Sequence, residues 1–429
     1  MKTNPSNISV VILVVGAFAI RIGYCAATGT LGHTPQKGYR EYVMAGERLL
    51  ASGTLVSPLI LDDAKAGRSS LLPPGYVALV AASYGLFGVE SWAATVMLQI
   101  ANGAATTIAA GVMWLIAGSV GGRRAAWGAG VISAVNPTLI GFTSYIWETS
   151  LFSVGVAVSV WLSLRLARTP ARARSYFVYG LWLGALALLN PALTIAYPLL
   201  VLFPLWRTCG ANGKRLSIGV MAAVLGWAIA ITPWTIRNYS QLGELTYVRS
   251  GFMLELWLGV CPEADANGAA VYDKQFPLNN AEVQRKVAEI GEGAFIKECG
   301  RKAKEAIARD PMRFAKLVLM RVVDYWTGAA LTHAEPGGGV LPRSRGRLFV
   351  MVFFSMEVLV LIVVLFYPVN SPGITRWLIG IIVLFSIVYC ITHVQIRFRT
   401  PTEPLTAALI GMLVFGRANQ TGIPDRRGS

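Results

Sequence analysis

Long apolar runs recur along most of this chain, and they constrain its fold more than any other feature. We identify ten runs that could cross a bilayer, at residues 8–27, 91–117, 125–143, 149–166, 176–190, 193–206, 216–234, 347–367, 374–392 and 401–416. A spanning helix needs about 20 predominantly apolar residues. Only 14% of the 429 residues are charged, too few for the surface of a water-soluble protein of this size. The sequence therefore predicts an all-α polytopic membrane protein with about ten transmembrane helices.

Basic residues gather in the short loops and indicate the orientation of the chain. Loops 119–124, 165–175 and 207–215 contain Arg or Lys and no acid, and the tail 417–429 is also basic. Cytoplasmic loops of membrane proteins carry an excess of Lys and Arg. All four segments fall on the side of the N-terminus if the shorter apolar run 74–88 is a re-entrant or interfacial helix that does not cross. We therefore predict a multi-pass protein of the cytoplasmic (inner) membrane with both ends in the cytoplasm.

The net charge of +16 suggests nucleic acid in a soluble protein, but here the basic loops account for it. No basic helix alternates with aromatic residues that could stack on bases. We therefore expect the lipid bilayer, and no nucleic acid, as a partner of these loops.

Two polar segments remain on the outer side, at residues 28–73 and 235–346. The first contains a short amphipathic pattern that begins near Glu41 and stops at Gly53, which predicts an interfacial helix. The second is near-neutral and has helical periodicity over 280–327. We therefore divide the chain into a membrane bundle at 1–234 that includes the first outer loop, a small helical extracytoplasmic domain at 235–346, C-terminal helices at 347–416 and a cytoplasmic tail at 417–429.

The cysteine and histidine content argues against a metal site built from protein ligands alone. The chain has five Cys and three His, without CxxC or any Cys/His spacing typical of zinc sites. A divalent cation that bridges a substrate phosphate and an acidic side chain stays an open alternative. Cys261 and Cys299 could form a disulfide if the second outer segment faces an oxidising compartment, and the sequence does not decide this.

Short motifs follow one another along most of the chain. The acid Glu41 in the first outer loop is followed by Pro73-Pro74-Gly75-Tyr76 and Leu86-Phe87-Gly88, then Trp147-Glu148, Asn190-Pro191, Pro233-Trp234-Thr235-Ile236-Arg237-Asn238-Tyr239, Glu255-Leu256-Trp257 and Arg397-Phe398-Arg399-Thr400-Pro401. In this order they resemble the GT-C superfamily of membrane glycosyltransferases, in an uncharacterised bacterial branch. That superfamily includes the protein mannosyltransferases and the lipid A aminoarabinose transferases, which use polyprenyl-phosphate sugars as donors.

The resemblance implies a fold and a reaction. The fold is a bundle of transmembrane helices with interfacial helices in the first outer loop. The reaction moves a hexosyl or pentosyl group from a polyprenyl-phosphate donor to a lipid, glycan or protein acceptor on the outer face of the cytoplasmic membrane.

The residue types fit this chemistry. A carboxylate must take the proton from the acceptor hydroxyl, and Glu41 is our candidate for this base. Fixed cations must hold the departing lipid phosphate, and Arg237, Arg397 and Arg399 lie at predicted outer ends of spans, where Arg can bind phosphate through two hydrogen bonds. Further candidates for the same cavity are Arg40, Tyr42, Asp62, Asp63, Glu148 and Glu255.

Each assignment has a simpler alternative. Glu41 could be a solvated acid that is favoured by the N-terminus of its helix. The arginines could extend to lipid headgroups without binding a substrate. The alternative for the whole protein is a transporter or flippase of a lipid-linked glycan, although the chain has no internal repeat of the kind found in many transporters.

Overall fold

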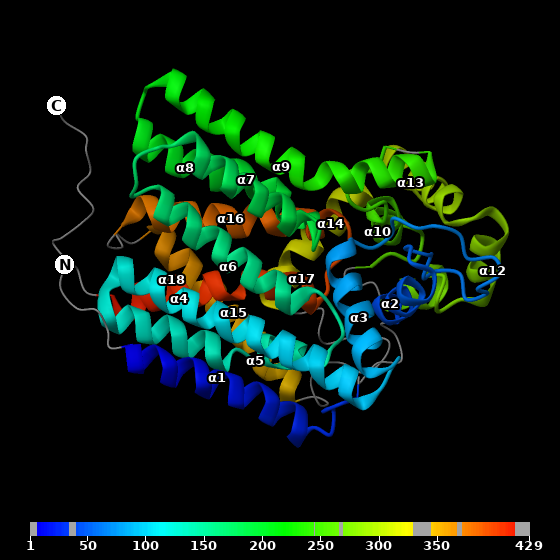
Figure 1. Cartoon of the computed structure of the whole chain (residues 1–429), viewed down its shortest axis with the longest axis horizontal. Helices are drawn as coiled ribbons and strands as arrows, with labels where there is room; N and C mark the ends of the chain where they lie inside the picture. Colours follow the sequence, from blue (N-terminus) through cyan, green and yellow to red (C-terminus); the bar gives the residue numbers. More distant parts are fainter. Residues whose placement is uncertain are drawn as a thin grey trace.

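The computed structural model describes residues 7–33, 40–243, 245–265, 269–328, 345–366 and 371–416. Within these ranges the chain is helical, and its β-structure is limited to one isolated bridge between Val56 and Arg68. Figure 1 shows long helices running side by side through most of the molecule, with shorter helices gathered at one end. The all-α prediction is confirmed.

The long helices form the membrane bundle. Their bounds are α1 (Asn7–Ala27), α4 (Trp92–Val135), α6 (Thr149–Leu166), α7 (Ala173–Ala187), α8 (Tyr197–Cys209), α9 (Gly213–Leu242), α15 (Arg345–Phe366), α16 (Pro372–Ile391) and α18 (Glu403–Phe415). By length and apolar composition, six of the described helices could cross a membrane. This confirms a multi-pass membrane protein, and the predicted count of ten spans stays a prediction.

Helix α4 is two antiparallel helices joined at Gly122. This glycine has φ +82°, in the left-handed region that glycine adopts readily because it has no Cβ. A Cβ built on Gly118 would lie 3.0 Å from the Cβ of Ala126. Eight residues of straight helix would separate them by about 12 Å, so the chain must reverse here. The predicted basic loop 119–124 is therefore a tight turn between two helices.

The buried Arg21 of α1 ties that helix to both arms of the α4 hairpin. Its guanidinium donates to Thr106 Oγ1 (2.6 Å) on the first arm and to the carbonyl oxygens of Ala134 (3.0 Å) and Ser133 (3.2 Å) on the second. A charged group this deeply buried requires such a set of acceptors.

Short helices gather at one end of the bundle, and we call them the outer helices because all but one of them lie in the two predicted outer segments (Figure 1). They are α2 (Glu41–Ser52), α3 (Pro74–Phe87), α10 (Phe252–Val260), α11 (Ala269–Gln275), α12 (Ala281–Ile290), α13 (Glu292–Arg309) and α14 (Pro311–Thr327). Gly53 caps α2 at φ +68°, and Gly291 separates α12 from α13 at φ +82°. Four short turns complete the described chain, at α5 (Pro137–Gly141), η1 (Phe142–Ser144), η2 (Pro191–Ala196) and α17 with η4 (Ile396–Arg399 and Thr400–Thr402).

The two predicted outer segments share one apolar core. Leu59 and Leu71 of the first segment pack in the same cluster as Leu254 and Phe295 of the second. The buried carboxylate of Glu292 accepts hydrogen bonds from Ser69 Oγ at 2.7 and 2.9 Å. The first outer loop is therefore fixed against the second segment, and the two together cover one end of the bundle.

Two details refine the predicted division of the chain. Helix α9 continues to Leu242, past residue 234, where the sequence analysis placed the end of the bundle. Cys261 and Cys299 are both buried in the shared outer core, and both are free thiols.

Candidate functional site

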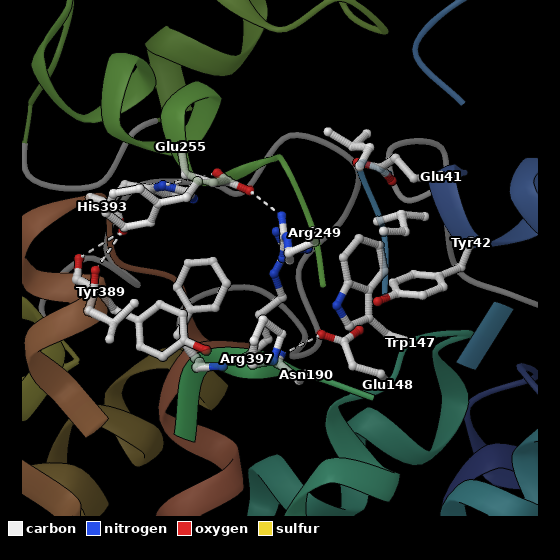
Figure 2. Close-up of a pocket in the computed structure, with 18 of the residues that line it drawn as sticks. Glu41, Tyr42, Trp147, Glu148, Asn190, Arg249, Glu255, Tyr389, His393 and Arg397 are labelled. Atoms are coloured by element: carbon white, nitrogen blue, oxygen red, sulfur yellow. Dashed lines mark hydrogen bonds and ion pairs between the residues drawn. The ribbon is translucent and has the colours of Figure 1, made fainter. Parts of the chain in front are cut away.

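A cavity of about 340 Å³ lies between the outer helices and the ends of the membrane helices (Figure 2). Its walls come from α2, the residues before α6, η2, the segment before α10, α10 itself, α11, the end of α16 and α17. The ionisable side chains that line it, other than tyrosines, are Glu41, Glu148, Arg249, Glu255, His393 and Arg397. Segments from the whole length of the sequence therefore meet at this site.

Glu41 is the first residue of α2 and lines the cavity. Its side chain is only 7% exposed, and its Oε2 has no hydrogen-bond partner in the described structure. Burial raises the pKa of Glu41 to about 7, although the nearby charge of Arg397 opposes this shift. A carboxyl group with this pKa exchanges a proton near neutral pH, as a general base must.

The packing of α2 explains why Glu41 points inward. Tyr42 is buried with its ring edge-on to Trp147 at a centroid distance of 4.8 Å and to Tyr76 at 5.2 Å. Ala45, one turn further along α2, is also buried. The apolar face predicted for this helix therefore fixes its start at the cavity, and Tyr42 lines the cavity as the sequence predicted.

Glu148 is the second buried carboxyl group of the cavity. It directly precedes α6 and is 6% exposed. Asn190 Nδ2 donates to Glu148 Oε1 at 2.9 Å, while Asn190 Oδ1 accepts from the backbone N–H of Ala192 at the start of η2. Asn190 therefore both caps a helical turn and orients the carboxylate.

Arg397 lines the cavity, and Arg399 does not. The Arg397 guanidinium lies over the Trp147 indole, 4.3 Å from the ring centroid. Arg399 Nε donates to Glu403 Oε1 at 2.6 Å, Nη2 pairs with Glu357, and Nη1 donates to the carbonyl oxygen of Trp326 at 2.8 Å. Residues two apart on a helical turn point to opposite sides, which separates the predicted pair.

Arg237 also lies outside the cavity lining, contrary to its predicted position. Its guanidinium donates to the carbonyl oxygens of Ser69 (2.7 Å) and Leu55 (3.2 Å) and lies 4.8 Å from the Trp234 ring centroid. Because these acceptors belong to the first outer loop, Arg237 joins that loop to α9.

Three other predicted cavity residues lie elsewhere. Arg40 and Asp63 line a separate cavity of about 460 Å³ together with Glu47 and Arg48. Asp63 pairs with Arg48 at 2.5 Å, and the exposed Asp62 lies 3.8 Å from Lys65. The sequence gives no signal for the direction in which these acidic side chains turn. Both are exposed, Asp62 beside the exposed Lys65 and Asp63 beside the largely buried Arg48.

Figure 2 shows Glu255 and His393 on the side of the cavity opposite Glu41. We call these two residues, together with Tyr272 beside His393, the far wall, and Arg249 lies next to it. Arg249 Nη2 lies 3.5 Å from Glu255 Oε1, and His393 Nδ1 lies 3.5 Å from Glu255 Oε2. His393 Nε2 and the Tyr272 hydroxyl are 2.9 Å apart. Glu255 was a predicted cavity residue, whereas the sequence reasoning assigned no role to the other three.

Among the described residues, no group of three or more His, Cys, Asp or Glu side chains is placed to hold a metal ion. A divalent cation between Glu41 or Glu148 and a substrate phosphate stays a prediction.

Comparisons with known proteins concern the fold. The archaeal oligosaccharyltransferase AglB of Archaeoglobus fulgidus in its apo form has a TM-score of 0.55 and 12% identity over 96% of this chain and 51% of its own. AglB in complex with an inhibitory peptide and a dolichol-phosphate has a TM-score of 0.51 and 13% identity over 93% and 49%. ArnT of Cupriavidus metallidurans, bound to undecaprenyl phosphate, has a TM-score of 0.41 and 16% identity over 96% and 79%.

No protein-family profile matches the sequence, and no curated protein matches it. The chain spans about half the length of AglB. At 12–13% identity, the agreement between the two structures concerns the arrangement of helices and not the residues of a site. The resemblance that the motifs predicted is confirmed at the level of the fold, which this chain shares with AglB.

Proposed function

We propose that this protein is a membrane glycosyltransferase that moves a sugar from a polyprenyl-phosphate donor to an acceptor hydroxyl. The observation that carries the proposal is the single cavity in which Glu41, Glu148 and Arg397 meet between membrane helices and outer helices. Its position between membrane helices and outer helices supports entry of a lipid headgroup there, next to carboxylates and a fixed cation.

Arg397 is the proposed ligand of the donor phosphate. Its guanidinium is held over Trp147 and is 9% exposed, so its position is defined before a substrate binds. Arg249 also lines the cavity, where its guanidinium faces the Glu255 carboxylate at 3.5 Å. Fixed cations of this kind stabilise the negative charge that develops on a leaving phosphate.

Glu41 is the proposed base. The acceptor oxygen attacks the anomeric carbon, the bond between that carbon and the phosphate oxygen breaks, and the acceptor proton passes to the Glu41 carboxylate. The lipid phosphate leaves with the electron pair of the broken bond. Glu148, oriented by Asn190, would bind the acceptor or the sugar beside this base.

The proposed location is the outer face of the cytoplasmic membrane. Helix α6 begins beside Glu148 and ends at Leu166, about 27 Å away for its 18 residues. Beyond its far end, Arg168 Nη2 donates to Ser119 Oγ at 3.0 Å, so two of the basic loops lie side by side. These two basic loops therefore lie at the end of α6 away from the cavity, which supports a cytoplasmic position for them.

The purified protein in proteoliposomes tests the proposal. The probe is a polyprenyl phosphate that carries a radiolabelled sugar, supplied with a glycolipid extract as the source of acceptor. We expect labelled product together with one free polyprenyl phosphate for each sugar transferred. Movement of the intact labelled lipid across the bilayer, without cleavage of the sugar–phosphate bond, would support the transporter or flippase instead.

A further inference from the structure

The far wall is a buried polar surface for which the proposed transfer step has no use. His393 is 2% exposed, and Glu255 is half-buried beside it. Glu255 Oε2 and His393 Nδ1 both lack a hydrogen-bond partner in the described structure. Buried polar atoms are nearly always hydrogen-bonded, so two such atoms on the wall of a cavity point to a ligand.

The distance between these atoms identifies the kind of group that fits. Glu255 Oε2 and His393 Nδ1 are 3.5 Å apart, longer than a good N–H···O hydrogen bond of about 2.9 Å. Burial lowers the pKa of His393 to about 4, so its imidazole is neutral near pH 7 and offers one donor and one acceptor nitrogen. A hydroxyl group can donate to the carboxylate and also interact with the imidazole.

The charges of the far wall select among hydroxylated ligands. The Glu255 carboxylate already faces the Arg249 guanidinium at 3.5 Å, and Tyr272 and His393 are neutral. The wall together with Arg249 is therefore close to neutral. A cationic amino sugar would need an uncompensated carboxylate here, and an acidic sugar would need an uncompensated cation.

The position of the far wall indicates which part of the donor it would contact. In Figure 2, Arg249 and Arg397 lie between the far wall and the side of the cavity that holds Glu41 and Glu148. A phosphate held by Arg397 would leave the base facing the acceptor and the far wall facing the non-reacting part of the sugar. Tyr389 and Phe398 are stacked at 4.3 Å and also line the cavity, where they offer apolar surface to the sugar ring.

We propose that the far wall binds the ring hydroxyls of a neutral, hydroxyl-bearing donor sugar, and thereby determines which sugar the protein accepts. This inference rests on the proposed function, because it takes the donor phosphate to lie at Arg397. Glu255 and His393 contact the sugar directly, and Tyr272 is a positioning residue that holds the imidazole.

Binding of defined lipids to the purified full chain in nanodiscs tests the inference. The probes are short-chain polyprenyl phosphates that bear glucose, mannose, galactose or 4-amino-4-deoxyarabinose, together with the same lipid phosphate without a sugar. We expect at least one neutral sugar to tighten binding relative to the bare lipid phosphate. Glu255→Gln and Tyr272→Phe should each reduce that gain by about tenfold, the usual worth of a hydrogen bond to a charged or buried group.

Two controls separate the possible outcomes. Glu263→Gln alters a carboxylate that lies outside the cavity and accepts from Gln275 Nε2 at 3.1 Å, so it should leave all affinities unchanged. Retained binding of the bare lipid phosphate shows that a far-wall variant is folded. If wild type binds the bare lipid phosphate but gains nothing from a neutral sugar, or favours the amino sugar, the inference is wrong. If wild type binds no polyprenyl phosphate, the proposed function itself fails.

Discussion

Two clusters of one arginine and two glutamates lie close together in this molecule, and they differ in what the arginine contacts. In the bundle cluster, Arg399 is hydrogen-bonded to Glu403 at 2.6 Å and paired with Glu357, all three being almost fully buried. In the cavity cluster, Arg397 lies over Trp147 and lines the same open volume as Glu41 and Glu148.

The difference indicates how each cluster is used. The bundle cluster joins α17 to α15 and α18, and Asn136 Nδ2 donates to Glu403 Oε2 at 3.0 Å to extend it to the end of α4. Its arginine is bonded to both glutamates, and these contacts hold the helices together. Both clusters contain a carboxyl oxygen without a hydrogen-bond partner, on Glu357 and on Glu41, but only the one on Glu41 belongs to a residue that lines the cavity, where a substrate could reach it. We therefore propose a structural role for the bundle cluster and a catalytic role for the cavity cluster.

The largest expected effect is that of Glu41→Gln. The amide keeps the shape of the side chain but cannot accept the proton, so the transfer rate should fall by about 100- to 10,000-fold. Glu47→Gln, on the same helix but outside the cavity, is the matched control and should retain its activity. The measurement is the rate of sugar transfer at saturating donor. A loss of activity in the control and not in Glu41→Gln would remove Glu41 from the site.

Arg399→Ala should mainly affect stability. Removing one partner of a buried ion pair leaves uncompensated carboxyl groups and typically costs about 3–5 kcal/mol in the free energy of unfolding. Denaturant unfolding in detergent measures the change, with Arg397→Ala for comparison. An equal loss of unfolding free energy in the two variants would contradict the different roles of the two clusters.

Arg397→Ala should mainly affect the donor. A lost hydrogen bond to a charged group is worth about 1.5–3 kcal/mol, so the affinity for polyprenyl phosphate should fall by about 10- to 100-fold. Arg301→Ala, at an exposed ion pair with Glu305 on α13, is the matched control. The measurement is the affinity for the lipid phosphate in nanodiscs. An unchanged affinity in Arg397→Ala would show that Arg397 does not bind the phosphate.

The transfer rate should depend on pH through Glu41. Only the deprotonated carboxylate can act as base, so with a pKa of about 7 the rate should fall about tenfold for each pH unit below 7 and level off above it. A pH–rate profile of wild type between pH 5 and 9 tests this. A flat profile over that range would mean that the base has an ordinary carboxyl pKa or that a different step limits the rate.

The smallest effects are expected from Asp62→Asn and Asp63→Asn. Both residues lie outside the cavity that holds Glu41, and each faces a basic partner near the surface. Exposed ion pairs contribute about 0–1 kcal/mol, so activity should stay within about twofold of wild type. A loss comparable to that of Glu41→Gln would transfer the role of base to this acidic pair.

The sequence predicted the helices better than the directions of the side chains. Apolar runs and the stop at Gly53 are local signals, and the structure has helices where they occur. Arg397 and Arg399 face different sides because of the rotation of the four-residue helix α17. A segment this short has no apolar periodicity from which that rotation could be predicted. Arg249 meets His393, at the end of α16, only because the second outer segment packs over the bundle. Such long-range packing carries no local signal in a single sequence.

A structure of the protein in a nanodisc with bound polyprenyl phosphate tests the central claim most directly. The account predicts phosphate density in the cavity, within hydrogen-bond distance of the Arg397 guanidinium and near the Glu41 carboxyl group. Density at Arg237 or Arg399, with the cavity empty of lipid, would contradict it.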